Sequence, residues 1–140
     1  AASDVYKRQN TKQLRPMEFE SSEGFKIFVG RNNIMNDKLT LKTAKNYDLW
    51  FHVKKGAGAH VVVQSENGRE FTDKLIREAA MLAVQNSKAA SSSNVAVDYT
   101  IIKNVKKPNG AKPGMVIYDN YKTEYVTPNF DELERIKRIV

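Results

Sequence analysis

The alternation of apolar and polar residues predicts several short β-strands along the chain. Alternation is clear at 24–29, and β-branched or aromatic residues dominate 49–53, 60–64 and 95–102. Both patterns are typical of strands that bury one or both faces. Turn-forming residues such as Gly30-Arg31-Asn32-Asn33 separate these segments. We therefore expect a sheet of short strands, in which 60–64 is the hairpin partner of 49–53.

A 3.6-residue period predicts one long helix over residues 72–88. Thr72 is placed to cap it, because Asp73 and then an apolar period follow. One side of this helix is apolar and should face the core. That side carries Leu75, Ile76, Ala79, Leu82 and Ala83.

Three further elements follow from weaker signals. Residues 33–44 predict a short helix or turn, anchored by Ile34, Leu39 and Leu41. Asp119-Asn120 lies between two β-rich runs, 115–118 and 122–127, which indicates a hairpin. Residues 129–140 predict a last amphipathic helix that Asn129 or Asp131 caps and that runs through Ile139. Together the elements predict a single α+β domain, a mixed or antiparallel sheet of short strands with two or three packed helices.

Composition narrows the class of protein. The chain has 140 residues and no cysteine, so neither disulfides nor thiolate metal ligands are available. No apolar run approaches the ~20 residues that span a bilayer, and a secretory pattern is absent, so we expect a cytoplasmic setting and no membrane partner. Residues 1–10 lack any period and resemble a translated transposon end used in sequencing libraries. We interpret them as a non-native sequencing artefact.

Positive charge is concentrated in two stretches. The net charge is +7 and the isoelectric point is about 9.6. Residues 31–60 hold six Lys or Arg against two acids, and residues 103–122 hold five Lys against one acid. Two separate basic stretches on an otherwise nearly neutral chain fit a polyanion-binding protein, although a solvated face would give the same count.

Four groups of residues occur together in a fixed order. They are Gly30-Arg31-Asn32-Asn33 with Asn36-Asp37, then Asp48 to Val53, then Gly58 to Val62, and then Val97-Asp98-Tyr99 through 106–114 to Val126-Thr127-Pro128. Taken in order, they resemble the NFACT-R domain of RqcH-like ribosome quality control proteins, formerly labelled fibronectin-binding proteins. The resemblance covers residues 16–128. One departure is the loop before His60, where Ala57-Gly58-Ala59 replaces the usual Pro-Gly-Ser.

The resemblance implies an RNA-binding module and not an enzyme. It also implies large-subunit ribosomal RNA and tRNA (peptidyl-tRNA and alanyl-tRNA) as partners at stalled nascent chains, and a role in alanine tailing. Upstream domains of the same full-length protein would share that work. It implies no cofactor, metal or catalytic residue.

Residue chemistry gives candidates for RNA contacts. Lysines beside Pro108 and Pro113 would meet phosphates from a stiffened loop, and Arg31 would grip a phosphate or stack on a base. Asn32 and Asn33 equally suit a turn or cap, and Trp50 equally suits the core. The candidates are Arg31, Asn32, Asn33, Trp50, His52, His60, Lys88, Lys103, Lys106, Lys107 and Lys112.

Two alternatives remain open from the sequence. The first is a metal- or nucleotide-dependent enzyme, in which Asp48, His52 and His60 would form the cluster. The second is a fibronectin-binding surface adhesin, which the older family name suggests.

Overall fold

The computed structural model describes residues 15–140. The segment that we interpret as an artefact, residues 1–10, lies outside the described residues. Within 15–140, seven strands form one antiparallel sheet in the spatial order β8-β5-β3-β4-β2-β1-β9. The strands are β1 (Met17–Glu20), β2 (Lys26–Val29), β3 (Leu49–Val53), β4 (Val61–Val63), β5 (Val95–Ile101), β8 (Lys122–Val126) and β9 (Lys137–Arg138).

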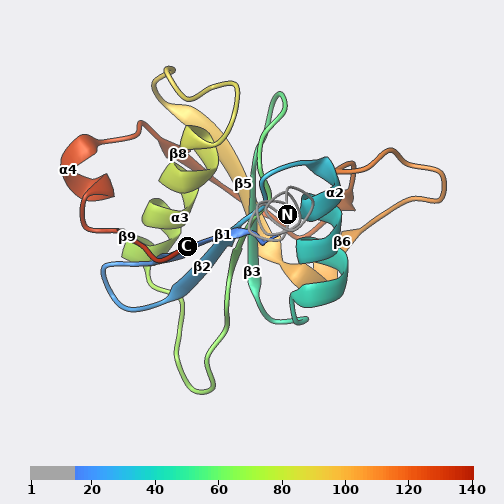
Figure 1. Cartoon of the computed structure of the whole chain (residues 1–140), viewed down its shortest axis with the longest axis horizontal. Helices are drawn as coiled ribbons and strands as arrows, with labels where there is room; N and C mark the ends of the chain where they lie inside the picture. Colours follow the sequence, from blue (N-terminus) through green and yellow to red (C-terminus); the bar gives the residue numbers. More distant parts are fainter. Residues whose placement is uncertain (1–14) are drawn as a thin grey trace, which may run out of the picture.

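The sheet separates two layers, which Figure 1 shows on either side of the central strands. Helix α3 (Asp73–Gln85) covers one face, and α2 (Asn33–Lys38) with the π-helical turn η1 (Leu39–Thr43) covers the other. The predicted α+β class is therefore confirmed, and so is the pairing of 49–53 with 60–64, since β3 and β4 are hydrogen-bonded neighbours.

Helix α3 forms as its sequence predicts. The Thr72 side chain accepts a hydrogen bond from the Leu75 amide at 3.1 Å, which caps the first turn. The apolar side of the helix packs on Phe51 and Val61, which point to this face from neighbouring strands. Buried Glu78 accepts bonds from the Ser22 amide and hydroxyl, at 2.9 and 2.6 Å, and so fixes the β1–β2 turn to the helix.

The opposite face of the sheet carries a smaller apolar cluster. Trp50 and Val62 project there from β3 and β4, and they pack against Leu39 of η1. Alternate residues of a strand point to opposite faces, so Trp50 and Phe51 serve different cores. The expected anchor Leu39 is confirmed, whereas Ile34 is 74% and Leu41 38% exposed. Met35 fills the place predicted for them, because the short helix turns that side inward.

The predicted hairpin around Asp119-Asn120 is wrong, although the turn itself exists. Asn120 has a left-handed backbone, with φ +48°. However, β7 (Ile117–Tyr118) pairs with β6 (Val105–Lys106) in a separate two-stranded sheet, while β8 pairs with β5. The strands separate because Tyr118 turns to the Trp50 cluster, whereas Val126 is buried in the α3 core. A 3₁₀ turn (Ile102–Asn104) leads from β5 into β6.

The predicted C-terminal helix through Ile139 is also wrong. Helix α4 covers only Phe130–Leu133, with Asn129 as its N-cap, and β9 follows. Strand β9 pairs with β1, where Arg138 lies opposite Phe19. Pairing with β9 gives hydrogen-bond partners to the backbone groups on the outer edge of β1. Ile136 is also buried in the core beside α3. An extended C-terminal end therefore satisfies more backbone groups than a longer helix would.

Gly30 directly follows β2, at a point where the fold leaves no room for a side chain. A Cβ there would lie 1.9 Å from the Asn36 side-chain oxygen, and Asn36 is itself buried. We predict that Gly30→Ala lowers the free energy of unfolding by about 1–3 kcal/mol, as overpacking does. Urea unfolding of both proteins measures this.

Gly68→Ala is the matched control for Gly30→Ala. Gly68 has a positive φ of 75° but open space around it, so alanine there should cost only about 1 kcal/mol of backbone strain. An equal or smaller loss at Gly30 would contradict the crowding seen around Asn36.

Candidate nucleic-acid interface

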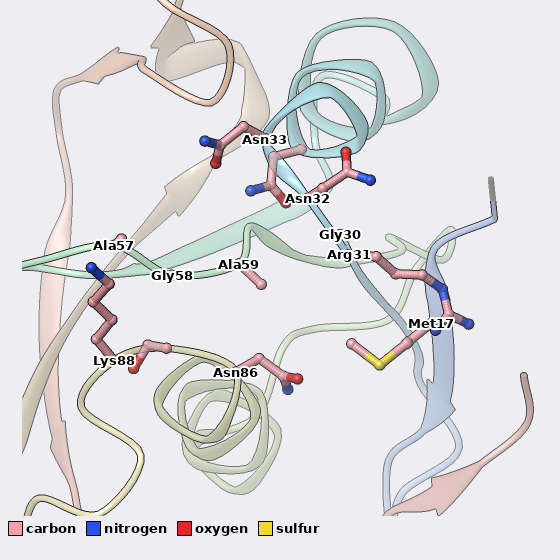
Figure 2. A pocket seen from close by; sticks show the side chains of 12 residues that line it. Met17, Gly30, Arg31, Asn32, Asn33, Ala57, Gly58, Ala59, Asn86 and Lys88 are labelled. Carbon is pink, nitrogen blue, oxygen red and sulfur yellow. The ribbon is translucent and has the colours of Figure 1, made fainter. Parts of the chain in front are cut away.

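Two basic side chains from distant parts of the sequence line one open pocket of about 500 Å³. Figure 2 shows Arg31 and Lys88 at opposite sides of this pocket, with Asn32, Asn33 and Asn86 between or beside them. None of the described residues that line it is acidic. We call it the asparagine pocket. Its lining is Met17, Gly30, Arg31, Asn32, Asn33, Asn36, Ala57, Gly58, Ala59, Asn86, Ser87 and Lys88.

One wall of the asparagine pocket is formed by α2 and the turn before it. Hydrogen bonds to backbone groups hold this wall in place. The Asn32 side chain accepts from the Met35 amide at 2.8 Å and so caps α2. The buried Asn36 side chain accepts from the His60 amide at 3.1 Å, and the Gly30 amide donates to the His60 carbonyl at 3.0 Å. These bonds fix the turn that carries Arg31 against the start of β4.

The other wall comes from the β3–β4 loop and the residues that follow α3. The Ala59 amide donates to the Asn86 carbonyl at 3.0 Å, and the Lys88 amide donates to the Ala57 carbonyl at 3.1 Å. Gly58 and Ser87 form an isolated β-bridge between these bonds. Lys88 is thereby placed beside the loop, although it lies far from that loop in the sequence.

The basic loop, which we define as residues 107–116, is held against α2 by two contacts with Asp37. The Lys107 ammonium lies 3.1 Å from an Asp37 carboxylate oxygen. It also donates to the carbonyls of Lys112 and Met115, at 2.6 and 3.2 Å. The Gly114 amide donates to the same Asp37 carboxylate at 2.9 Å. Asp37 therefore pairs with a lysine and organises a loop that Figure 1 shows projecting past α2.

His52 and His60 do converge across β3 and β4, with their ring centres 5.4 Å apart. Asp48 does not join them. Its carboxylate accepts from the Lys45 amide and from the Ser65 amide and hydroxyl. Four residues of extended strand separate Asp48 from His52, about 13 Å. The predicted Asp48, His52 and His60 cluster is therefore wrong, and no group of three metal-ligating side chains occurs among residues 15–140.

His60 is a buried, neutral, structural histidine. Its Nε2 lies 3.1 Å from the Gly114 carbonyl, which only accepts, so Nε2 carries the proton. Its Nδ1 then accepts from the Thr40 hydroxyl at 2.8 Å. Burial lowers the pKa of His60 to about 4, and nearby His52 acts in the same direction. Burial also lowers the pKa of His52, against hydrogen bonds to the Val53 and Gly58 backbone.

Asp98 gathers three donors where β5 passes behind the basic loop. Its carboxylate accepts from the Tyr118 and Thr123 hydroxyls, at 2.6 and 2.8 Å, and pairs with Lys54 at 3.2 Å. Burial and the Asp98 charge raise the pKa of the Tyr118 hydroxyl, and its bond to Asp98 raises the pKa of Lys54. Asp98 thereby ties β5 to β7 and β8.

The predicted contact residues lie in different surroundings. His52 is half-buried and lines the cleft beside Trp50. Arg31, Asn32, Asn33 and Lys88 meet at the asparagine pocket. Trp50 and His60 are buried, with exposures of 0% and 1%, so neither ring has a face at the surface, and Trp50 packs in the smaller apolar cluster.

Four lysines remain outside the asparagine pocket. Lys107 is engaged by Asp37, and Lys106 and Lys112 are exposed on β6 and on the basic loop. Lys103 lies over the Tyr47 ring at the start of β3, and it lines neither the asparagine pocket nor the cleft beside Trp50. The positively charged stretches thus meet at α2, where Asn33 lies against Gly114.

Sequence reasoning missed several residues of the site. Met17 and Asn86 line the asparagine pocket, and Lys54 lines the cleft beside Trp50. Lys54 belongs to the first basic stretch, so its positive charge could have marked it as a candidate. Met17 and Asn86 carry no motif, since they meet the site only through strand order and the end of α3.

The structure is an α+β domain with an open pocket that two cations and no described acidic residue line, and the comparisons give its family. A sequence profile for "NFACT protein RNA binding domain" matches residues 15–120. The chain therefore belongs to the NFACT family of RNA-binding domains.

Particular relatives extend the match. The chain is 48% identical to "Rqc2 homolog RqcH" of Bacillus subtilis over 86% of its length and 20% of that protein. It is 29% identical to "Coiled-coil domain-containing protein 25" of Bos taurus, over 73% and 50%.

One solved structure confirms the fold. It is the C-terminal part of the fibronectin/fibrinogen-binding protein from Streptococcus suis, with a TM-score of 0.80 and 41% identity. The match covers 88% of this chain and 49% of that one. The chain spans about a fifth of the bacterial RqcH relatives that it matches. None of the described helices has the length and apolar character needed to cross a bilayer.

Acid should destabilise the fold through His60. The folded pKa is about 4 and the ordinary value is 6.5. Below the ordinary value the unfolded chain takes up a proton that the folded chain excludes, so stability falls as the pH drops from 6.5 toward 4. The loss is about 3 kcal/mol. Urea unfolding across this window should show a flatter pH dependence for His60→Gln. An equally steep dependence in that variant would assign the effect to other groups.

Proposed function

We propose that this domain grips RNA through its phosphate backbone at the asparagine pocket. The observation that carries the proposal is the charge of that pocket, where Arg31 and Lys88 lie at opposite sides and no described lining residue is acidic. The Arg31 Nε donates to the Arg15 carbonyl at 2.7 Å, so a phosphate would meet the terminal nitrogens of the guanidinium. An arginine fork and a lysine on opposite sides suit neighbouring phosphates of one strand. Membership of an RNA-binding domain family supports the same conclusion.

The asparagines add uncharged hydrogen-bonding groups to the pocket between the two cations. Asn33 is exposed and borders both the asparagine pocket and the cleft beside Trp50. Its amide offers donors and an acceptor, which suits ribose hydroxyls or base edges as well as phosphate oxygens. Asn32 and Asn36 have structural bonds that position Arg31. The Asn86 side chain also donates to the Leu82 carbonyl at 2.8 Å, so Asn33 is the main contact candidate among the asparagines.

The exposed lysines of the basic loop extend the same surface. Lys112 is exposed on a loop whose base Lys107 fixes to α2. Fixing the base lowers the entropy lost when the loop settles on a polyanion. Lys106 and Lys112 are therefore the contact lysines of this segment, and Lys107 is a positioning residue.

The relatives support a place in ribosome quality control for the full protein. Those named "Rqc2 homolog RqcH" are 38–48% identical to this chain. On this proposal the domain helps the full-length protein hold large-subunit ribosomal RNA and tRNA at stalled nascent chains in the cytoplasm, and so supports alanine tailing. Upstream domains would supply the rest of that activity.

Reversing the two pocket cations should weaken RNA binding and its dependence on salt. We predict that Arg31→Glu with Lys88→Glu lowers affinity for single-stranded RNA by about tenfold or more. The slope of log affinity against log salt should fall by about two, one for each lost phosphate contact. Fluorescence anisotropy of labelled RNA across a salt series measures both.

The matched control is Lys74→Glu with Arg135→Glu. Both side chains are exposed, and neither lines the asparagine pocket. The control changes net charge by the same amount, so it isolates position from total charge. Equal losses in the two double variants would place binding elsewhere on the surface.

A ribosome assay tests the basic loop in the full-length protein. We predict that Lys106→Glu with Lys112→Glu reduces co-sedimentation with large subunits while the domain stays folded. Lys107 is left intact, because its ion pair with Asp37 holds the loop. Unchanged co-sedimentation would remove these lysines from the interface.

A second candidate function rests on one similar structure. That protein is titled a fibronectin/fibrinogen-binding protein, and its fold matches at a TM-score of 0.80. Immobilised fibronectin tests the candidate directly. Retention of this chain that the Arg31→Glu, Lys88→Glu variant shares would support adhesion through another surface.

A further inference from the structure

A second pocket, of about 310 Å³, lies beside the asparagine pocket on the face of the sheet opposite α3. We call it the tryptophan pocket. Trp50 and His52 form its floor, and Pro113 to Val116 of the basic loop form its outer wall. Its volume is at the lower end of the range for small-molecule sites, which run from about 300 Å³ upward.

The tryptophan pocket contains a buried donor that lacks a partner. The Trp50 side chain is fully buried, and its indole N–H forms no hydrogen bond with the described residues. An unsatisfied buried donor costs about 1–3 kcal/mol. Every other polar group of the floor has a partner, because His52 bonds to the Val53 carbonyl and His60 to Thr40 and Gly114. The indole N–H is thus an unsatisfied donor beneath the pocket. Because Trp50 is 0% exposed, a ligand can bond to this donor only when the side chains that cover it move aside.

The charges around the tryptophan pocket are already balanced. Asp98 is neutralised by Lys54, with further bonds from Tyr118 and Thr123. None of the described lining residues is acidic. The outer wall is apolar at Pro113, Met115 and Val116. A flat, uncharged, polar-edged group fits these walls better than an ion.

The two pockets are adjacent. Asn33, Ala57 and Gly58 line both of them. A strand whose phosphates lie between Arg31 and Lys88 would therefore pass close to the tryptophan pocket. Met115 is 60% exposed at the mouth, where a thioether side chain can cover the face of an inserted ring.

We propose that the tryptophan pocket holds one unpaired nucleobase of the RNA whose backbone lies in the asparagine pocket, with a base acceptor bonded to the Trp50 indole N–H. The inference rests on the proposed function for the backbone. It adds that the domain prefers single-stranded or flipped-out nucleotides, because a paired base inside a duplex cannot enter. Recognition is of a base edge and a ring face rather than of phosphate alone.

The chain's single tryptophan makes the proposal directly measurable. The probe is a short fluorescein-labelled oligoadenylate, compared with the same strand carrying abasic sites. Anisotropy reports backbone binding, and unlabelled strands report the base through the fluorescence of Trp50. The intact strand should bind several-fold more tightly and quench Trp50, whereas the abasic strand should bind without quenching.

Met115→Ala and Ile117→Ala form a matched pair of variants. Both side chains are about 60% exposed on the same segment, but only Met115 lines the tryptophan pocket. Met115→Ala should weaken binding of the intact strand about threefold to tenfold and leave the abasic strand unchanged, if the base packs on the thioether. Ile117→Ala should change neither.

The two possible failures are distinguishable. Equal affinity for intact and abasic strands, with Trp50 unquenched by both, would overturn the base pocket and leave backbone binding in place. Absence of any anisotropy change with either strand would overturn the proposed function and the base pocket together.

Discussion

The buried bond between the Asn36 side chain and the His60 amide is the constraint on which the interface depends. It joins the turn after β2 to the start of β4, and the Gly30 amide closes the same contact from the other side. Removal of this bond would leave a buried amide and a buried carbonyl group unsatisfied, at about 1–3 kcal/mol each. With the contact in place, the turn that carries Arg31 is fixed at one side of the pocket, and Lys88 is fixed at the other side by its bond to the Ala57 carbonyl.

The polar residues of this domain therefore have two roles. Some fix the backbone, as Asp37 does when it binds Lys107 and the Gly114 amide. Others stay exposed at the surface that the first kind builds, as Asn33 and Lys88 do. Both kinds lie in the same short motifs, because a turn that positions a cation needs its own hydrogen bonds satisfied before a ligand arrives.

The sequence predicted the elements whose signals are local. The period of α3, its Thr72 cap and the β-branched runs of β3 to β5 are properties of neighbouring residues. The partners of β7 and the end of the chain were mispredicted, because a turn at Asn120 does not decide which strands pair across it. Extended pairing with β1 also outweighed the weak helical period after Asn129.

The sequence indicated which kinds of residue line the site. It did not indicate which of them already have partners within the chain. Arg31 and Lys88 were both candidates from the sequence, and the structure places them on one pocket. In the structure Lys107 makes an ion pair, Trp50 lies in an apolar cluster and His60 makes two hydrogen bonds, and the sequence indicated none of these partners. A sequence shows that a side chain has the chemistry for a contact. It does not show whether another part of the same chain already makes that contact.

The central claim is that RNA meets the walls of one pocket at the same time. Amide chemical-shift mapping of the labelled chain during titration with single-stranded RNA tests it most directly. The predicted result is a joint, saturable change at Gly30 to Asn33, Ala57 to Ala59 and Ser87 to Lys88, with one dissociation constant. Changes confined to α4 and β9, or spread evenly over all exposed lysines, would contradict a defined interface at the asparagine pocket.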